Sequence, residues 1–259
     1  MRHTLAAAIV TILCTQSAFA TSYNSPLPTF SAPPLPIKAF ACPKTPSPII
    51  EYAPKSRYNQ QDPTRSTVDA KAASEYNKTS APLRDYTKNL IAMANKYYRS
   101  GGASSAISAC VTTWIADWAK ADALSHLTTF QSQFGIGQHL TSISMAWLQV
   151  RDSIPKEDPN IAIITAWLQT RARELPPRFA ALPADSIVSH SNIRAWNALA
   201  ASIIAVISGD EKLYDWGMES MDGILATVTT DGFLPSELKR AARARDYHLF
   251  AISALVMQV

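Results

Sequence analysis

Two short segments of the sequence concentrate side chains that could do chemistry. The first spans residues 189–196, contains His190, Asn192 and Arg194, and leads into an apolar run typical of a helix. Its polar groups would therefore lie at a helix N-terminus, where unpaired backbone N–H groups and the helix dipole favour an anion. The same residues would equally serve as an ordinary helix cap, with Ser191 or Asn192 accepting the backbone hydrogen bonds.

The second segment, residues 232–248, is basic and ends in Tyr247 and His248. Arg240, Arg243 and Tyr247 are spaced by three and four residues, so they would share one face of a helix. Arginines that flank a tyrosine favour its phenolate and lower its pKa. A solvated basic face with a half-buried Tyr247 would show the same spacing.

Motifs for metal and nucleotide chemistry are missing from the sequence. It has no HExxH, CxxC, Walker or GxSxG motif, and its histidines lack the spacing of metal ligands. We therefore expect neither a metal nor another cofactor. The net charge of +4 is too small a surplus to indicate a nucleic-acid partner, although it is compatible with an anionic substrate.

The elements that position these segments are predicted to be helices. From Ala81 onward apolar residues recur every three or four positions, and short breaks with Gly or Pro separate about seven such stretches, without strand-like alternation. The tetrapeptide Ala-Trp-Leu-Gln occurs at 146–149 and again at 166–169, as expected for helices that present similar faces to one core. This pattern predicts an all-α fold of antiparallel helix pairs. The sequence ends at Val259 inside an apolar run, which suggests a shortened domain or a truncated chain.

The first 20 residues have the features of a secretory signal peptide. Arg2 and His3 form a short basic start, residues 5–14 are apolar but too short to span a bilayer, and Ala-Phe-Ala at 18–20 is a typical cleavage motif. No later stretch is long and apolar enough to cross a membrane. We therefore expect a mature protein that is soluble and exported, either to the periplasm or out of the cell.

Residues 21–54 contain nine of the 17 prolines. Because proline fixes φ and has no N–H, this composition predicts an extended N-terminal arm ahead of a single domain at residues 55–259. Loss of the signal peptide leaves Cys42 and Cys110, an isolated pair that in an oxidising compartment is a candidate disulfide. Two unrelated buried thiols are the alternative.

Together, these motifs resemble the family 5 polysaccharide lyases, the periplasmic alginate (polymannuronate) lyases. The matching stretches, in chain order, are Ser56-Arg57-Tyr58, Cys110 with Trp114 and Trp118, Leu-Tyr-Asp-Trp at 213–216, Asp-Gly-Phe-Leu-Pro at 231–235, Glu-Leu-Lys-Arg at 237–240 and Tyr-His at 247–248. The resemblance runs from about Cys42 to the C-terminus. It implies an incomplete (α/α) toroid, and it implies that Cys42 and Cys110 form the disulfide of the family.

The resemblance also implies a reaction, the β-elimination of a 1,4-linked uronate polysaccharide without water or cofactor. Carried over by position, Asn192 and Arg240 would hold the C6 carboxylate, and Tyr247 would move the protons. Arg57 and Tyr58 would bind the sugar from the N-terminal side. In mannuronate and glucuronate the C5 hydrogen and O4 lie on the same face, so Tyr247 alone would suffice as base and then acid. We therefore expect a monomeric, syn-eliminating lyase that acts on such polymers.

One position departs from the family pattern, because the family histidine falls on Ile193. Isoleucine neither donates to a carboxylate nor moves a proton. His190, almost one helical turn earlier, or Arg194 is expected to bind the sugar in its place. Alternatively, the same groove binds acidic polysaccharide without cutting it, as a partner in exopolysaccharide secretion.

Overall fold

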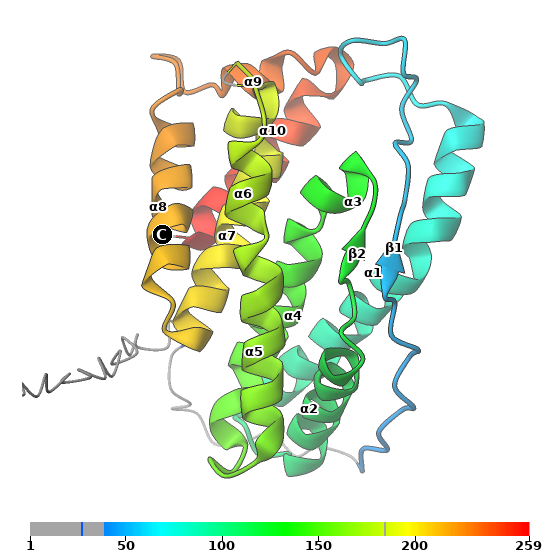
Figure 1. Ribbon diagram of the computed structural model, residues 1–259, viewed down its shortest axis with the longest axis vertical. Helices are drawn as coiled ribbons and strands as arrows, with labels where there is room; N and C mark the ends of the chain where they lie inside the picture. Colours follow the sequence, from blue (N-terminus) through cyan, green and yellow to red (C-terminus); the bar gives the residue numbers. More distant parts are fainter. Residues whose placement is uncertain (1–26, 28–38, 184, 259) are drawn as a thin grey trace, which may run out of the picture.

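The described part of the chain, residues 27, 39–183 and 185–258 of the computed structural model, is mostly helical, as the apolar spacing predicts (Figure 1). Its α-helices are α1 (Ala70–Arg99), α2 (Ser105–Lys120), α3 (Phe130–Gly135), α4 (Gly137–Val150), α5 (Pro159–Arg173), α6 (Leu175–Ala180), α7 (Asn192–Ser208), α8 (Glu211–Leu225), α9 (Pro235–Leu238) and α10 (Ala244–Gln258). Three 3₁₀ helices, η1 (Arg151–Ser153), η2 (Ile187–His190) and η3 (Ala241–Arg243), join some of them. The predicted signal peptide and half of the predicted arm lie outside the described residues.

Helix α7 is the central element of the bundle. It contacts α4, α5, α8 and α10, and its sequence is apolar on nearly every side, with runs of Ala, Ile and Leu that are buried. Helix α7 ends at Ser208 because Gly209 adopts a left-handed conformation with φ of 69°. The side chain of Asp210 then accepts from the backbone N–H of Leu213 and starts α8, so the two helices turn back on each other. The first turn of α7 therefore belongs to a helix that is packed firmly in the bundle.

Two short strands, β1 (Glu51–Tyr52) and β2 (His126–Leu127), form a parallel pair that the sequence did not predict. The pair is too short to show an alternating pattern in the sequence. It joins the described part of the arm to the segment after α2, and the backbone N–H of Leu124 adds a hydrogen bond to the carbonyl of Ile49. Residues 39–50 contain no helix, in agreement with the proline content.

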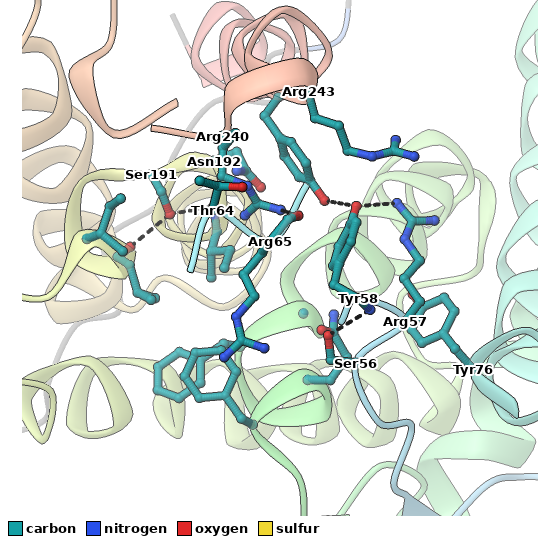
Figure 2. A pocket seen from close by; sticks show the side chains of 18 of the residues that line it. Ser56, Arg57, Tyr58, Thr64, Arg65, Tyr76, Ser191, Asn192, Arg240 and Arg243 are labelled. Atoms are coloured by element: carbon teal, nitrogen blue, oxygen red, sulfur yellow. Dashed lines mark hydrogen bonds between the residues drawn. The ribbon is translucent and has the colours of Figure 1, made fainter. Parts of the chain in front are cut away.

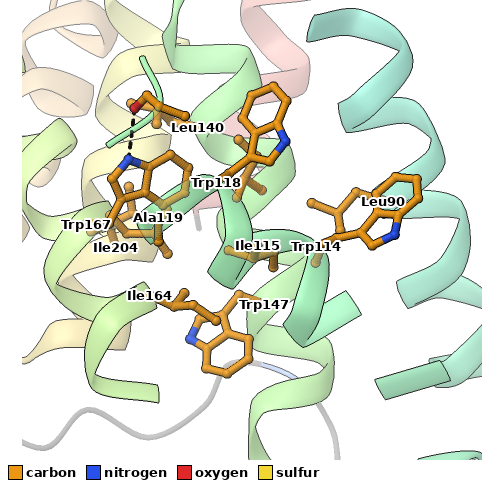
Figure 3. Close-up of a cluster of buried hydrophobic side chains, with 14 of the residues drawn as sticks. Leu90, Trp114, Ile115, Trp118, Ala119, Leu140, Trp147, Ile164, Trp167 and Ile204 are labelled. Carbon is orange, nitrogen blue, oxygen red and sulfur yellow. Dashed lines mark hydrogen bonds between the residues drawn. The ribbon is translucent and has the colours of Figure 1, made fainter. Parts of the chain in front are cut away.

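The tryptophans belong mainly to the core, where four of them are labelled in Figure 3. The ring of Tyr86 on α1 stacks on Trp118 of α2 with a centroid distance of 3.7 Å and lies 5.9 Å from Trp114. Both indoles also fix the arm, because Trp114 donates to the carbonyl of Pro43 (3.0 Å) and Trp118 to that of Pro46 (2.9 Å). Stacking and hydrogen bonding together place the arm along α2.

A disulfide joins Cys42 of the arm to Cys110 of α2, with a Cα–Cα distance of 5.6 Å. The predicted pairing is confirmed. The bridge closes the chain over a sequence separation of 68 residues, so it restricts the unfolded state strongly.

Replacing both cysteines with serine should lower the free energy of unfolding by about 3–4 kcal/mol, because the unfolded chain regains the freedom of that large loop. Urea unfolding followed by circular dichroism measures the change. A reductant should destabilise the wild-type protein by a similar amount and leave the double variant unaffected. An equal effect of reductant on both proteins would show that the bridge is not the cause.

Among the described residues, no helix has both the length and the apolar character needed to cross a membrane.

Candidate active site

A cleft of about 1380 Å³ lies where the ends of several distant segments meet. The loop at residues 55–69, helix α3, the first turn of α7 and the C-terminal residues around α9 and α10 all contribute lining side chains. Figure 2 shows the side chains that approach one another there. The sequence-predicted residues that line this cleft are Arg57, Tyr58, Asn192, Arg240 and Tyr247.

Two phenols meet in the cleft. The hydroxyl of Tyr247 on α10 is in short hydrogen-bond contact with the hydroxyl of Tyr58, and Arg57 donates to Tyr58 from the other side at 3.0 Å (Figure 2). Tyr58 is held by a bridge to Val68 that closes the loop between them. The two tyrosines are therefore one hydrogen-bonded system that an arginine polarises.

The pKa values of the two phenols shift in opposite directions. Burial raises the pKa of Tyr247, the bond with Tyr58 raises it further, and the positive charge of Arg240 opposes both effects. Burial would also raise the pKa of Tyr58, but its hydrogen bonds with Tyr247 and Arg57 outweigh burial and lower it. Because their hydroxyls share a hydrogen bond, the two phenols titrate as a coupled pair.

Arg240 lies against the catalytic candidate Tyr247. Its guanidinium carbon is 3.9 Å from the centroid of the Tyr247 ring, and its Nη2 donates to the backbone carbonyl of Arg65 at 2.9 Å. Arg243 similarly donates through Nε to the carbonyl of Ser66 at 3.1 Å. These two arginines therefore tie the loop at 55–69 to the C-terminal segment.

Arg240, Arg243 and Tyr247 do not come together on one common helix face, contrary to the prediction from their spacing. Arg240 precedes η3, Ala241 adopts a positive φ of 47°, and α10 begins only at Ala244. The helical structure is therefore interrupted between Arg240 and Tyr247. The two side chains meet because this break folds Arg240 back over the ring.

Asn192 occupies the first position of α7 and is bound by a carboxylate that sequence reasoning missed. Its Nδ2 donates to both oxygens of Glu237 at 3.0 and 3.1 Å, and its backbone N–H donates to Oε1 at 2.5 Å. Glu237 is 0% exposed and Asn192 3% exposed. Burial raises the pKa of Glu237, although the hydrogen bonds from Asn192 oppose that shift.

The chain is similar in sequence to a known protein family. The profile of a family described as alginate lyase matches residues 126–259, which is more than half of the chain. The chain belongs to the alginate lyase family.

Curated alginate lyases are similar in sequence to most of this chain. An alginate lyase of Pseudomonas putida is 29% identical over 228 residues, which are 84% of this chain and 59% of the relative. An alginate lyase of Azotobacter vinelandii is 30% identical over 230 residues, 85% of this chain and 59% of the relative. The chain thus spans about three-fifths of the length of these curated relatives.

Solved structures of alginate lyase A1-III also superpose on the chain. A histidine-to-alanine variant complexed with a tetrasaccharide gives a TM-score of 0.74 at 23% identity and covers 88% of this chain and 61% of its own. The enzyme from Sphingomonas species A1 gives 0.71 over 85% of this chain and 61% of its own, also at 23% identity. The predicted incomplete (α/α) toroid is confirmed.

Ile193, the residue on which the resemblance places the family histidine, lines the cleft, but neither His190 nor Arg194 does. His190 belongs to η2, and extended backbone at Ser191 separates it from α7, so it is not one helical turn before Ile193. Ser191 caps α7 by accepting from the N–H of Ile193. Thus the cap interpretation holds for Ser191, whereas the predicted position of His190, one turn before Ile193 on the same helix, is corrected.

Arg194 lies outside the cleft. Its guanidinium stacks on Trp216 (4.4 Å) and Phe179 (4.7 Å), and its Nε donates to the hydroxyl of Ser220 at 2.8 Å. Because successive residues of a helix are rotated by about 100°, a helix that turns Ile193 to the cleft turns Arg194 towards α8. The structure therefore places Arg194 in the packing between helices and not in the cleft where its binding role was predicted.

Proposed function

We propose that this chain is a polysaccharide lyase that cleaves a 1,4-linked uronate polymer of the mannuronate or glucuronate type by syn β-elimination. The observation that carries the proposal is the phenol of Tyr247, which lines the cleft with a guanidinium stacked on its ring and a second phenol at its hydroxyl. Family membership supports the reaction class.

In the proposed step the phenolate of Tyr247 takes the proton from C5 of the sugar. A double bond forms between C4 and C5 while the bond from C4 to O4 breaks, and the departing O4 receives the same proton from Tyr247. The products are a 4,5-unsaturated uronate and a shortened chain. Arg240 and Asn192 border the C6 group, and Arg57 and Tyr58 contact the sugar from the loop.

The charge around the phenols suits this step. The guanidinium carbons of Arg57, Arg240 and Arg243 lie 5.2, 5.4 and 5.7 Å from the centroid of the Tyr58 ring. Three cations so close to two coupled phenols favour the phenolate form and attract a polyanion. An anionic uronate polysaccharide is the partner that this charge fits.

The test is the absorbance near 235 nm, where the new double bond absorbs, during incubation with polymannuronate and with glucuronan. We expect an increase with at least one polymer and unsaturated oligosaccharides in the product. Binding of the polymers without any increase would instead support a non-catalytic polysaccharide-binding protein, which the isoleucine at position 193 favours.

We further propose export to the periplasm or beyond. The disulfide supports it, since such bridges persist in oxidising compartments. Fractionation of cells that express the full chain should place the protein outside the cytoplasm.

A further inference from the structure

Phe130 is a large apolar side chain that the fold leaves open to solvent inside the cleft. It lines the cleft from the first position of α3, and 54% of its surface is accessible. Among the described residues, the only other exposed large apolar side chain that lines the cleft is Ile187, which is not aromatic. A ring that is so exposed adds little to the core, so its place in the cleft favours contact with a ligand.

The short helix that carries this ring is held in place at its start. Thr129 caps α3 with its side chain, and the same hydroxyl donates to the carbonyl of Pro54 at 2.6 Å. One turn later, the ring of Phe134 packs 4.6 Å from that of Phe130 and is only 6% exposed. Phe134 in turn meets the ring of Phe179 edge to face at 5.2 Å. Phe130 is therefore backed by a buried aromatic pair and offers its remaining surface to the cleft.

An amide group without a partner lies next to the ring in the sequence. Gln131 also lines the cleft, and its Nε2 lies over Gly135, where an added Cβ would come within 3.1 Å of it. Among the described residues, the amide of Gln131 has no hydrogen-bond partner. It can therefore donate to and accept from the hydroxyl groups of a sugar. An aromatic ring beside a free amide is a combination that suits a carbohydrate ligand.

The cleft that holds Phe130 is the same cleft that holds the phenol pair. Trp196 of α7 and Phe250 of α10 also line it, with their rings 5.0 Å apart. The amide of Asn197 donates to the carbonyl of Phe134 at 2.8 Å and so joins α7 to α3. The cleft volume of about 1380 Å³ exceeds the roughly 300–1,000 Å³ of a small-molecule pocket, so the cleft has room for more than one sugar ring.

A uronate ring can stack on a phenyl group and keep its charge in water. In β-linked mannuronate and glucuronate the hydrogens at C1, C3 and C5 are axial on one face, which is therefore apolar. Guluronate carries axial oxygens at C1 and C3 on the corresponding face, so it stacks less well. The C6 carboxylate is equatorial and stays at the edge of the ring, where water and basic side chains reach it. Arg65 is one such side chain, since it lines the cleft and extends from its loop away from the two phenols (Figure 2).

We propose that α3 carries a sugar-binding subsite separate from the reaction centre, where one pyranose ring of the anionic uronate polymer stacks on Phe130 and Gln131 binds its hydroxyl groups. This inference rests on the proposed function and adds a place where the polymer is held beyond the linkage that is cleaved. The contact is the same before and during the reaction, so it strengthens binding without changing the chemical step. Loss of Phe130 should therefore raise KM and leave kcat nearly unchanged.

The experiment follows the cleavage of mannuronate oligosaccharides of increasing length at 235 nm. For the wild type, kcat/KM should rise with length until a sugar reaches Phe130. In Phe130→Ala the last part of this rise should be missing, so kcat/KM on the polymer falls about tenfold through KM, while the shortest cleaved oligosaccharides react as with the wild type. Phe130→Trp should keep the rise, because it retains an aromatic ring at this position.

Leu249→Ala is the matched control for the loss of exposed apolar surface. Leu249 is 59% exposed on α10 and does not line the cleft, so its removal should leave the length dependence as in the wild type. An effect of Leu249→Ala as large as that of Phe130→Ala would show that the loss is not specific to the subsite, and the inference would be wrong.

Binding is measured separately, by calorimetry with polymannuronate in a Tyr247→Phe background that does not cut the polymer. Adding Phe130→Ala should weaken binding about tenfold, and adding Gln131→Ala about threefold. Unchanged binding and an unchanged length dependence in Phe130→Ala would overturn the subsite and leave the proposed lyase function standing. An equal loss of kcat on short and long substrates would also overturn it, since Phe130 would then act only on the fold. If the wild type binds the polymer without cutting it, the lyase proposal fails, and the same calorimetry still decides whether Phe130 holds a sugar.

Discussion

Tyr247→Phe should lower the rate of double-bond formation by about 10³–10⁴-fold on any polymer that the wild-type protein cleaves. The variant keeps the ring that stacks on Arg240 and loses only the hydroxyl, which alone can take the C5 proton and return it to O4. Substrate binding should change little, because the phenol makes its main contacts with protein groups. The rate at 235 nm, together with polymer binding by calorimetry, separates the two effects.

Tyr76→Phe is the matched control for this loss. Tyr76 also lines the cleft, and its ring lies 5.9 Å from the guanidinium carbon of Arg57. The substitution removes a hydroxyl from the same cleft without touching the phenol pair, so activity should stay within about twofold of wild type. A Tyr247→Phe protein that retains more than a tenth of the activity would exclude Tyr247 as the proton-transfer group.

The helical fold could be predicted from the sequence, because the spacing of apolar residues indicates directly which face of a helix is buried. Helices α4, α5 and α7 keep that spacing over several turns, and Gly209 with Asp210 signals the turn that follows α7. The parallel β-pair was missed because two residues per strand cannot show a period. Helix α1 begins at Ala70, where Asp69 caps it, and Pro82 is accommodated inside it.

The candidate site could be predicted only in part, because the sequence gives the side chains but not the directions in which they point. Tyr58 and Tyr247 are 189 residues apart, and family resemblance alone brought them together before the structure did. His190 and Arg194 lie elsewhere than expected, because the helix does not continue backwards past Ser191 and because neighbouring residues of a helix point in different directions. The role of Glu237 beside Asn192 was not predicted, because nothing in the sequence indicates that a single acidic residue in a short segment is buried.

Arg240→Ala should lower the rate at neutral pH by about 10²–10³-fold, because it removes the positive charge that is stacked on the Tyr247 ring. The positive charge of Arg240 lowers the pKa of Tyr247, so its loss raises that pKa. The active form is the deprotonated one, and kcat/KM therefore rises with pH until the phenol pair has lost its first proton. In the variant this rise should move to higher pH, and part of the lost rate should return in alkaline buffer.

Two further substitutions distinguish charge from general weakening of the fold. Arg240→Lys keeps the positive charge but not the planar group that stacks on the ring, so its pH profile should lie between those of the wild type and Arg240→Ala. Arg245→Ala removes an arginine from the same helix as Tyr247, but this side chain is 88% exposed and pairs with Asp246, so its profile should match the wild type. If Arg240→Ala lost rate without moving its pH profile, the guanidinium would act on the substrate or the loop and not on the phenol. If Arg245→Ala shifted the profile as far, the net charge of the cleft region would account for both effects.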